Sequence, residues 1–272
     1  SLALSLLSMG DLKRGWQVFQ ESKDCVGALR DFIYPEWRGE AVTGKLLIYA
    51  NQGVGDELLF ASCFADIIKK VPQCVIECDP RLATLFRRSF PEAEIYGSPR
   101  LERDWLKQAE PIATQIAMDL VPSIVRRKLA DFPPGRSHYL KPDPKRIQYW
   151  QKRVAALGEG LKVGVAWRSG ALKGGRNLYY SALDEWTEIF KIQGIHFINL
   201  QYDECQAELD AAREQFSVAI TDFQGIDLKN DLDDAAALSS VMDLVISAGT
   251  TSAEIASAVG VPVWRMEAVK PS

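Results

Sequence analysis

Apolar runs that alternate with segments of helical periodicity constrain this chain more than any other feature. From Gly44 onward the order is strand, then helix, repeatedly. The run Lys45–Ala50 (KLLIYA) is almost continuously apolar, as expected of a strand buried on both faces. Residues 56–70 carry apolar side chains at helical spacing, and the same alternation restarts at Val163–Trp167 and continues to Val261–Met266. Such alternation predicts parallel sheets with helices on both faces, an α/β fold.

Prolines divide the predicted strands into two groups. The segment 138–144 (HYLKPDP) reads as a connector, and Asp143 is placed to cap a helix that follows it. Residues 1–40 differ, because a helix, a tight turn at Gly10-Asp11 and a second helix leave an apolar face that needs a partner. We therefore predict three parts: a helical segment over 1–40, a Rossmann-like domain over 41–142 and a second one over 143–272. Since the chain lacks an initial Met and stops just after an apolar run, we expect a piece of a longer protein.

Charge balance and cysteine usage narrow the function classes. The net charge of −4 and a pI near 5.4 argue against a nucleic-acid binder that works through a basic surface. No apolar run approaches the length of a membrane span, and Ser1–Leu7 lacks the basic region and cleavage site of a signal peptide. Five scattered cysteines indicate a reduced, cytoplasmic protein. Cys74 and Cys78 are either a metal-binding pair or small core residues, and we favour the core because no second Cys/His pair accompanies them.

The first segment with chemical potential is NQGVGD at 51–56, between a predicted strand and a predicted helix. Its glycines let the backbone turn tightly and approach a ligand. Asp56 lies near a helix N-terminus, where a carboxylate is stabilised. Two interpretations stay open, a catalytic carboxylate or the cap of a tight turn. A dinucleotide fingerprint is not supported, because Leu58 stands at the position of its third glycine.

Two segments of the second half have the composition of anion-binding sites. Residues 167–177 combine glycines with cations after a strand, which suits a diphosphate, although a solvated loop is the alternative. Residues 247–254 (SAGTTSAE) form a small-residue turn before a helix, where an anion or the helix's own cap can be accommodated. The amide of Gln201, at the end of another strand, is a weaker candidate for reading a base edge. The candidate nucleotide- and phosphate-binding residues are Arg168, Ser169, Gly170, Lys173, Arg176, Gln201, Gly249, Thr250, Thr251 and Glu254.

Other polar residues support no further chemistry. Asp231, Asp233 and Asp234 precede an apolar helix and are interpreted as caps, not metal ligands. The two histidines, His138 and His196, have no Ser or Cys nucleophile in a recognisable pattern, so triad hydrolysis is not supported.

Together these segments resemble a known group of enzymes. The runs IYANQGVGDELLFA (48–61), VGVAWRSG (163–170), FINLQ (197–201), LVIS (244–247) and IASAVGVPVW (255–264) are similar, in this order, to bacterial glycosyltransferases related to the heptosyltransferases of lipopolysaccharide synthesis. The branch fused to tetratricopeptide repeats (TPRs), distantly related to protein O-GlcNAc transferases, matches best. The N-terminal run ALSLLSMGDLKRGWQVFQ is similar to its last repeat. The resemblance implies a GT-B pair of Rossmann-like domains, acceptor-side first and nucleotide-sugar-side second, after a TPR-like segment.

The resemblance also implies roles for single residues. Asp56 matches the position of an Asp proposed as the catalytic base, which takes a proton from the acceptor hydroxyl. Gln52, Gly53 and Gly55 belong to the acceptor-side loop. Cations and helix N-termini stabilise the departing diphosphate, so neither a metal nor a cofactor is required.

One segment departs from the family pattern. Relatives usually show Asp-Thr-x-x-x-His, where this chain has Gly249 and Glu254 at the Asp and His positions. A Glu at this place is still able to hold a ribose through its hydroxyls.

Three functions stay open. The first is transfer of a sugar from a nucleotide-sugar donor to a protein or surface-polymer acceptor, with a protein partner for the TPR-like helices. The second is a non-catalytic GT-B-like scaffold that works beside helical repeats. The third is a nucleotide-sugar epimerase, for which this chain offers few candidate groups. The first two differ in whether Asp56 faces a cleft opposite Arg168 and Thr250 or bonds only to the backbone N–H groups of its own helix.

Overall fold

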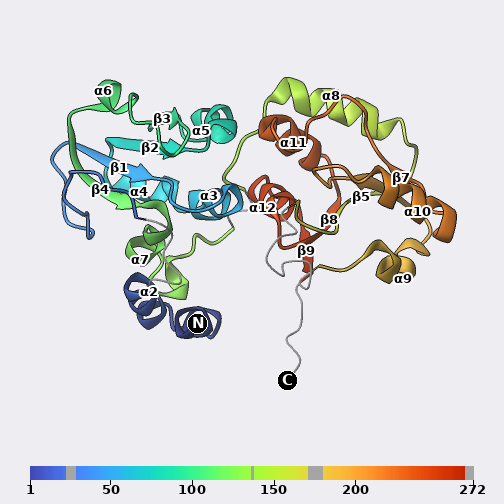
Figure 1. Ribbon diagram of the computed structural model, residues 1–272, viewed down its shortest axis with the longest axis horizontal. Coiled ribbons are helices and arrows are strands. Elements are labelled where there is room, and N and C mark those ends of the chain that lie inside the picture. Colours follow the sequence, from blue (N-terminus) through green and yellow to red (C-terminus); the bar gives the residue numbers. More distant parts are fainter. Residues whose placement is uncertain (23–28, 136–137, 171–179, 267–272) are drawn as a thin grey trace. The chain divides into compact units, whose positions relative to one another are not determined.

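The computed structural model describes residues 1–22, 29–135, 138–170 and 180–266 (Figure 1). The chain forms two compact units, unit 1 over Ser1–Tyr139 and unit 2 over Leu140–Ser272. The division falls inside the predicted connector. Each unit contains a wholly parallel sheet, which confirms the predicted α/β fold.

Unit 1 is built on a four-stranded sheet in the order β3-β2-β1-β4. Its strands are β1 (Lys45–Tyr49), β2 (Cys74–Cys78), β3 (Glu94–Gly97) and β4 (Ile112–Ala117). Its helices are α1 (Leu2–Ser8), α2 (Leu12–Glu21), α3 (Val54–Ala61), α4 (Phe64–Lys70), η1 (Pro80–Leu82), α5 (Ala83–Ser89), α6 (Leu106–Ala109), η2 (Met118–Leu120), α7 (Pro122–Val125) and η3 (Leu129–Asp131). The central strand β1 is buried from Leu46 to Tyr49, as its apolar run predicts.

The two N-terminal helices belong to unit 1. Asp11 caps α2, and Gly10 takes a positive φ of 82° in the turn between α1 and α2, so the predicted helix–turn–helix is present. The indole of Trp16 donates to the carbonyl of Arg126 at 2.9 Å, just after α7. Trp16 of α2 thus contacts the end of α7 within unit 1, and the bounds 1–40 of a helical segment stay a prediction.

Unit 2 is built on a five-stranded sheet in the order β7-β6-β5-β8-β9. Its strands are β5 (Leu161–Ala166), β6 (Ile195–Asn199), β7 (Ile220–Thr221), β8 (Leu244–Ala248) and β9 (Val263–Met266). Its helices are α8 (Pro144–Ala155), η5 (Leu183–Trp186), α9 (Thr187–Phe190), α10 (Gln206–Phe216), α11 (Leu232–Ser239) and α12 (Thr251–Ala258).

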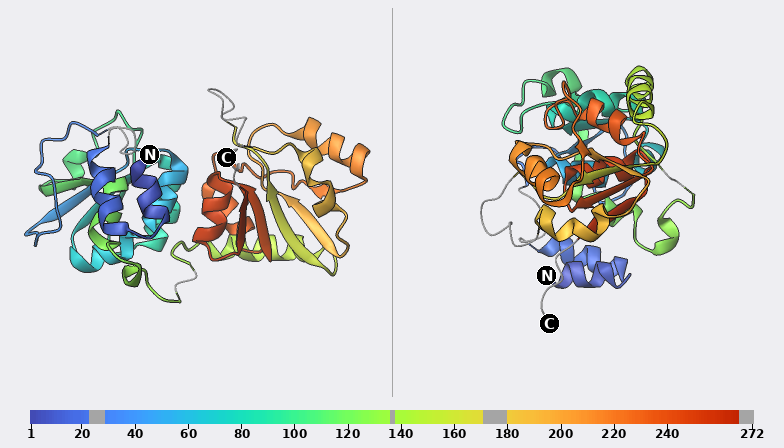
Figure 2. Two further views of the ribbon diagram at one scale, coloured as in Figure 1. Left: turned by 90° about the horizontal axis from the view of Figure 1, so that it is seen from below. Right: turned by 90° about the vertical axis from the view of Figure 1, so that its right-hand side faces the viewer.

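Side chains of β5 alternate between two cores, one on each face of the sheet. Val163 and Val165 pack with residues of α9 and α10, while Ala166 packs with residues of α8, α11 and α12. Figures 1 and 2 show the helices of unit 2 on both sides of its sheet. The period of two along the strand thus produces the expected three-layer arrangement.

The strand order places the turns that matter for function. In unit 2 the chain runs from β5 outward to β7, then returns to β8 on the other side of β5. The order reverses between β5 and β8, and ligands of open parallel sheets bind outside the carboxyl ends of strands at such a point. Within the described residues, no helix combines the length and apolarity needed to cross a bilayer.

Candidate functional site

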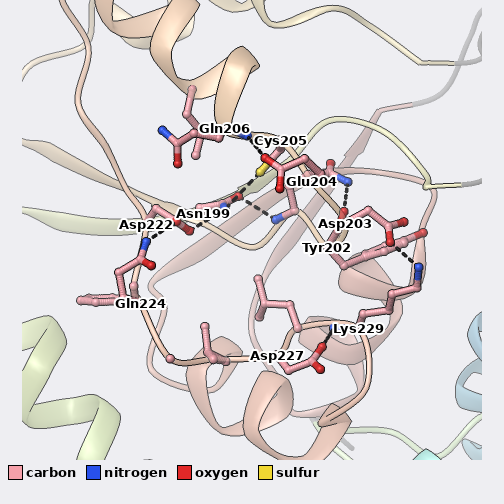
Figure 3. Close-up of a pocket in the computed structure, with 16 residues that line it drawn as sticks. Asn199, Tyr202, Asp203, Glu204, Cys205, Gln206, Asp222, Gln224, Asp227 and Lys229 are labelled. Atoms are coloured by element: carbon pink, nitrogen blue, oxygen red, sulfur yellow. Dashed lines mark hydrogen bonds and ion pairs between the residues drawn. The ribbon is translucent and has the colours of Figure 1, made fainter.

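A cavity of about 740 Å³ opens in unit 2 beyond the carboxyl ends of β6 and β7 (Figure 3). This size falls in the range of small-molecule sites. In the view of Figure 3, Asp222 and Gln224 lie on one side of the cavity, with Asp203 and Lys229 on the other. The lining is mostly polar and comprises Asn199, Gln201, Tyr202, Asp203, Glu204, Cys205, Gln206, Leu209, Asp222, Phe223, Gln224, Gly225, Ile226, Asp227, Leu228 and Lys229.

Hydrogen bonds fix the polar walls of the cavity. The Asn199 amide donates to Asp222 Oδ1 at 2.8 Å, and Gln224 donates to Asp222 Oδ2 at 3.0 Å. Asp203, with a positive φ of 68°, forms an ion pair with Lys229. Bonds from Asn230, chiefly its side-chain amide, lower the pKa of Asp227. The cavity is therefore preformed and presents carboxylates suited to hydroxyl and amino donors.

The turn after β5 is held by Gln201. Its Oε1 accepts from the backbone N–H groups of Trp167 and Arg168, both at 3.1 Å, and its Nε2 donates to the carbonyl of Tyr202 at 2.8 Å. Gln201 is 2% exposed. The amide of Gln201 therefore holds the turn, and a contact of this residue with a base edge stays a prediction.

Arg168, predicted to bind phosphate, has its guanidinium bound to helix α10. Nε donates to both carboxylate oxygens of Glu208, at 2.9 and 3.1 Å, and Nη2 donates to the carbonyl of Glu204 at 2.8 Å. Burial alone raises the pKa of Glu208, but hydrogen bonds from Arg168 and Trp167 bring it below its usual value. Arg168 thus connects the β5 turn to α10, and the guanidinium N–H groups that make these bonds are not directed at a ligand.

The rest of this turn makes close contact with the cavity wall. Ser169 Oγ lies 3.2 Å from the Tyr202 hydroxyl. A Cβ on Gly170 would lie 1.5 Å from Asp203 Oδ2, so a larger residue at this position requires that carboxylate to move. The other predicted cations of this segment, Lys173 and Arg176, lie outside the described residues.

The turn between β8 and α12 contains the second predicted anion site. Thr250 is the N-cap residue, but its side chain makes no capping bond, in contrast to the expected hydroxyl cap, and lies 3.4 Å from Ser247 Oγ. Thr251 is the first helical residue and is half-buried. Glu254, in the first turn of α12, accepts from Arg265 Nη1 at 2.9 Å. Arg265 was not among the predicted residues.

In unit 1 the loop after β1 has the predicted strand–turn–helix form. Asp56 Oδ2 accepts from the backbone N–H of Gly53 at 3.1 Å, so the half-buried carboxylate caps its own helix. Gln52 donates to Asp119 Oδ2 at 2.7 Å, and Gly55 lies in the first turn of α3. The capping interpretation is thereby realised, and a capping carboxylate is still chemically able to accept a proton.

Two buried glutamates beside this loop were missed by the sequence reasoning. Glu77 is fully buried in β2, accepts from the backbone N–H of Ala50 at 2.9 Å and pairs with Arg30 at 2.5 Å. Glu57 is 2% exposed and accepts from the backbone N–H of Asp79 at 2.8 Å. The sequence does contain a signal for Glu77, since an acidic residue inside the apolar run CVIEC is unusual for a buried strand.

The candidate metal ligands have structural roles. Cys74 and Cys78 are buried, and the Cys74 thiol donates to the carbonyl of Val71 at 3.0 Å. Asp231 caps α11. Within the part of the chain that the structure describes, no three His, Cys, Asp or Glu side chains are grouped to hold a metal ion.

Comparison with known proteins gives one sequence relative and several structures with the same fold. No protein-family model matches the chain. Protein FlbA of Caulobacter vibrioides is 33% identical over 282 residues, which cover 97% of this chain and 47% of that protein. The chain thus spans about half the length of this curated relative.

Solved glycosyltransferase structures share the fold at low identity. The family 9 glycosyl transferase of Veillonella parvula matches with a TM-score of 0.63 and 11% identity, covering 82% of this chain and 80% of that one. The ADP-heptose lipopolysaccharide heptosyltransferase II of E. coli matches at 0.58 and 13%, covering 81% and 84%. The E. coli heptosyltransferase WaaC with ADP matches at 0.51 and 12%, covering 81% and 86%. The two parallel-sheet units therefore have the fold of these glycosyltransferases.

Proposed function

We propose that this chain is a glycosyltransferase that transfers a sugar from a nucleotide-sugar donor to a hydroxyl of a protein or surface-polymer acceptor. The observation that carries the proposal is the preformed cavity of unit 2, which opens at the carboxyl edge of the sheet. The shared fold with the heptosyltransferases supports it. The reaction takes place in the cytoplasm and requires neither a metal nor a cofactor.

The donor nucleotide binds in unit 2. Its base and ribose occupy the cavity, where carboxylates such as Asp222 and Asp227 accept hydrogen bonds from amino and hydroxyl groups. Its phosphate lies toward the turns after β5 and β8, where backbone N–H groups at the N-terminus of α12 favour an anion. Lys173 and Arg176 supply cations to this phosphate, while Arg168 and Gln201 hold the β5 turn in place.

The acceptor binds in unit 1, beside the loop Gln52–Asp56. Asp56 accepts the proton of the attacking hydroxyl as the bond to the anomeric carbon forms, and the nucleotide leaves with the electron pair of the broken bond. A partner protein docks on the helices α1 and α2. The capping bond between Asp56 and Gly53 orients the carboxylate before the acceptor arrives.

A non-catalytic scaffold is the competing function. Two observations favour it: Asp56 caps its own helix, and the Arg168 guanidinium is bound to Glu208. A scaffold has no need to bind a nucleotide, so donor binding separates the two functions.

A thermal-shift screen with ADP, GDP, UDP, CMP and their sugar conjugates tests the donor site. A ligand at one hundred times its Kd adds about 2.7 kcal/mol to stability. For a protein of this size that raises Tm by about 5–10 °C. Gln206→Trp places a large ring at the cavity wall and abolishes the shift. Gln215→Trp, on the same helix outside the cavity lining, is the matched control and retains it. No shift with any nucleotide on folded protein would favour the scaffold.

A further inference from the structure

Arg265 reaches from the edge strand β9 onto the turn between β8 and α12. A Cβ added to Gly249 would lie 2.9 Å from Nη2 and 3.0 Å from Nε of Arg265. The first distance is shorter than real Cβ contacts and the second is tighter than most of them, so a side chain at 249 requires the guanidinium to shift. The φ of Gly249 is not positive, so the steric contact that a side chain meets at this position is with the Arg265 guanidinium and not with its own backbone.

Glu254 anchors the guanidinium from the first turn of α12. Its Oε1 accepts from Arg265 Nη1 at 2.9 Å, and the two side chains are 15% and 47% exposed. Glu254 is thus largely enclosed while Arg265 keeps a surface that a ligand can reach. The pair fixes one edge of the planar guanidinium.

The position of this cation is electrostatically unusual. The N-terminus of a helix carries partial positive charge and favours anions, so a cation there opposes the helix dipole. Glu254 compensates part of that charge. The guanidinium and the N-terminus of α12 nevertheless place two positive elements together, at the turn that follows β8.

We propose that Arg265, held by Glu254 and accommodated by Gly249, binds the phosphate group of the nucleotide donor. The inference rests on the proposed function and assigns a residue to its phosphate subsite. Guanidinium groups bind phosphate oxygens through geometrically matched N–H donors, and charge assistance makes these bonds strong. Gly249 provides the space that the cation needs, and Glu254 keeps it from moving into solvent.

The alternative is that Arg265 only neutralises Glu254. In that case Arg265→Ala still weakens nucleotide binding, because it leaves the Glu254 carboxylate to repel the phosphate. The double variant Arg265→Ala/Glu254→Gln separates the two roles, because it removes both the cation and the repelling charge.

Calorimetric titration of full-length protein tests the proposal. The probes are pyrophosphate, the nucleotide among ADP, GDP, UDP and CMP that gives the largest thermal shift, and the matching nucleoside. We expect Arg265→Ala to raise the Kd of the nucleotide by about 10- to 100-fold, as for loss of a charged hydrogen bond. The Kd of the nucleoside stays unchanged, since it has no phosphate. Arg213→Ala, which removes an exposed arginine of α10, serves as the control and binds like wild type.

Two further variants sharpen the result. We expect Gly249→Ala to raise the Kd of the nucleotide and to leave the Kd of the nucleoside unchanged, because its methyl group displaces the guanidinium. We expect the double variant Arg265→Ala/Glu254→Gln to bind the nucleotide as weakly as Arg265→Ala does.

Two outcomes overturn the inference in distinguishable ways. Wild-type affinity in Arg265→Ala, or full recovery in the double variant, overturns the role of Arg265 and leaves the proposed function standing. A wild-type protein that binds neither the nucleotides nor pyrophosphate overturns both.

Discussion

Glu57 makes the stability of unit 1 depend on pH in an unusual direction. Burial is the main cause that raises the pKa of this carboxyl from 4.5 to about 8. The backbone N–H of Asp79 and the guanidinium of Arg100 oppose this rise, whereas the charges of Asp79 and Glu77 add to it. In the native protein Glu57 therefore keeps its proton at pH values where the unfolded chain has released it.

The sign follows from proton binding. Between pH 4.5 and about 8 the native state binds more protons than the unfolded state, so the free energy of unfolding falls as pH rises. The contribution is complete below pH 4.5 and is lost as pH rises through about 8. With 1.36 kcal/mol for each pKa unit, the loss is about 1 kcal/mol at pH 5 and about 3 kcal/mol at pH 7.

Glu57→Gln removes this dependence, because an amide does not ionise and its carbonyl still accepts from the N–H of Asp79. We expect the stability of the variant relative to wild type to increase with pH, by about 3 kcal/mol from pH 4 to pH 7. Urea unfolding at pH 4, 5, 7 and 8 measures the difference. Glu92→Gln makes the same exchange at an exposed position and is the control. Parallel pH profiles for Glu57→Gln and wild type would refute the reasoning.

Three further substitutions test other buried contacts. Arg126→Ala leaves Asp66 without its buried guanidinium, which bonds it at 2.5 Å, and should cost about 3–5 kcal/mol in chemical denaturation; an unchanged midpoint would contradict this. Gly164→Ala places a methyl group 2.4 Å from Leu200 Cδ1 and should destabilise unit 2 by about 1–3 kcal/mol, seen as a lower Tm. Trp150→Phe removes an indole N–H bond of 2.7 Å to a carboxylate of α11 and should cost about 1–3 kcal/mol, whereas wild-type stability would show that the bond contributes nothing.

The sequence predicts the layers of the fold well because strand burial is a local property. The apolar runs at β1 and at Val163–Trp167, which overlaps β5, identify both central strands before any contact is known. The single helix expected over 56–70 is wrong in detail, since it breaks into α3 and α4. Phe64, at the start of α4, packs edge-on against two phenylalanines of the α5 region, and this tertiary contact overrides local periodicity.

The candidate site is harder to predict from the sequence than the fold, because its side chains bond to residues that are far away along the chain. Arg168 has the composition and place of a phosphate ligand, yet Glu208, forty residues later, holds its guanidinium. Gly249 reads as a flexible turn residue, and only the packing of Arg265 against it reveals a steric reason. Local composition indicates where such a site lies, whereas pairings between strands and helices decide which side chain faces a ligand.

Release of free nucleotide from the bound nucleotide-sugar tests the central claim most directly. Wild type and Asp56→Asn are compared with the donor that gives the largest thermal shift, with water as the acceptor. The Asn retains the cap but not the base, so we predict an unchanged Kd and a rate lower by about 100-fold or more. Equal rates in the two proteins, or no release by a wild-type protein that binds the donor, would contradict the account of this chain as a glycosyltransferase with Asp56 as its base.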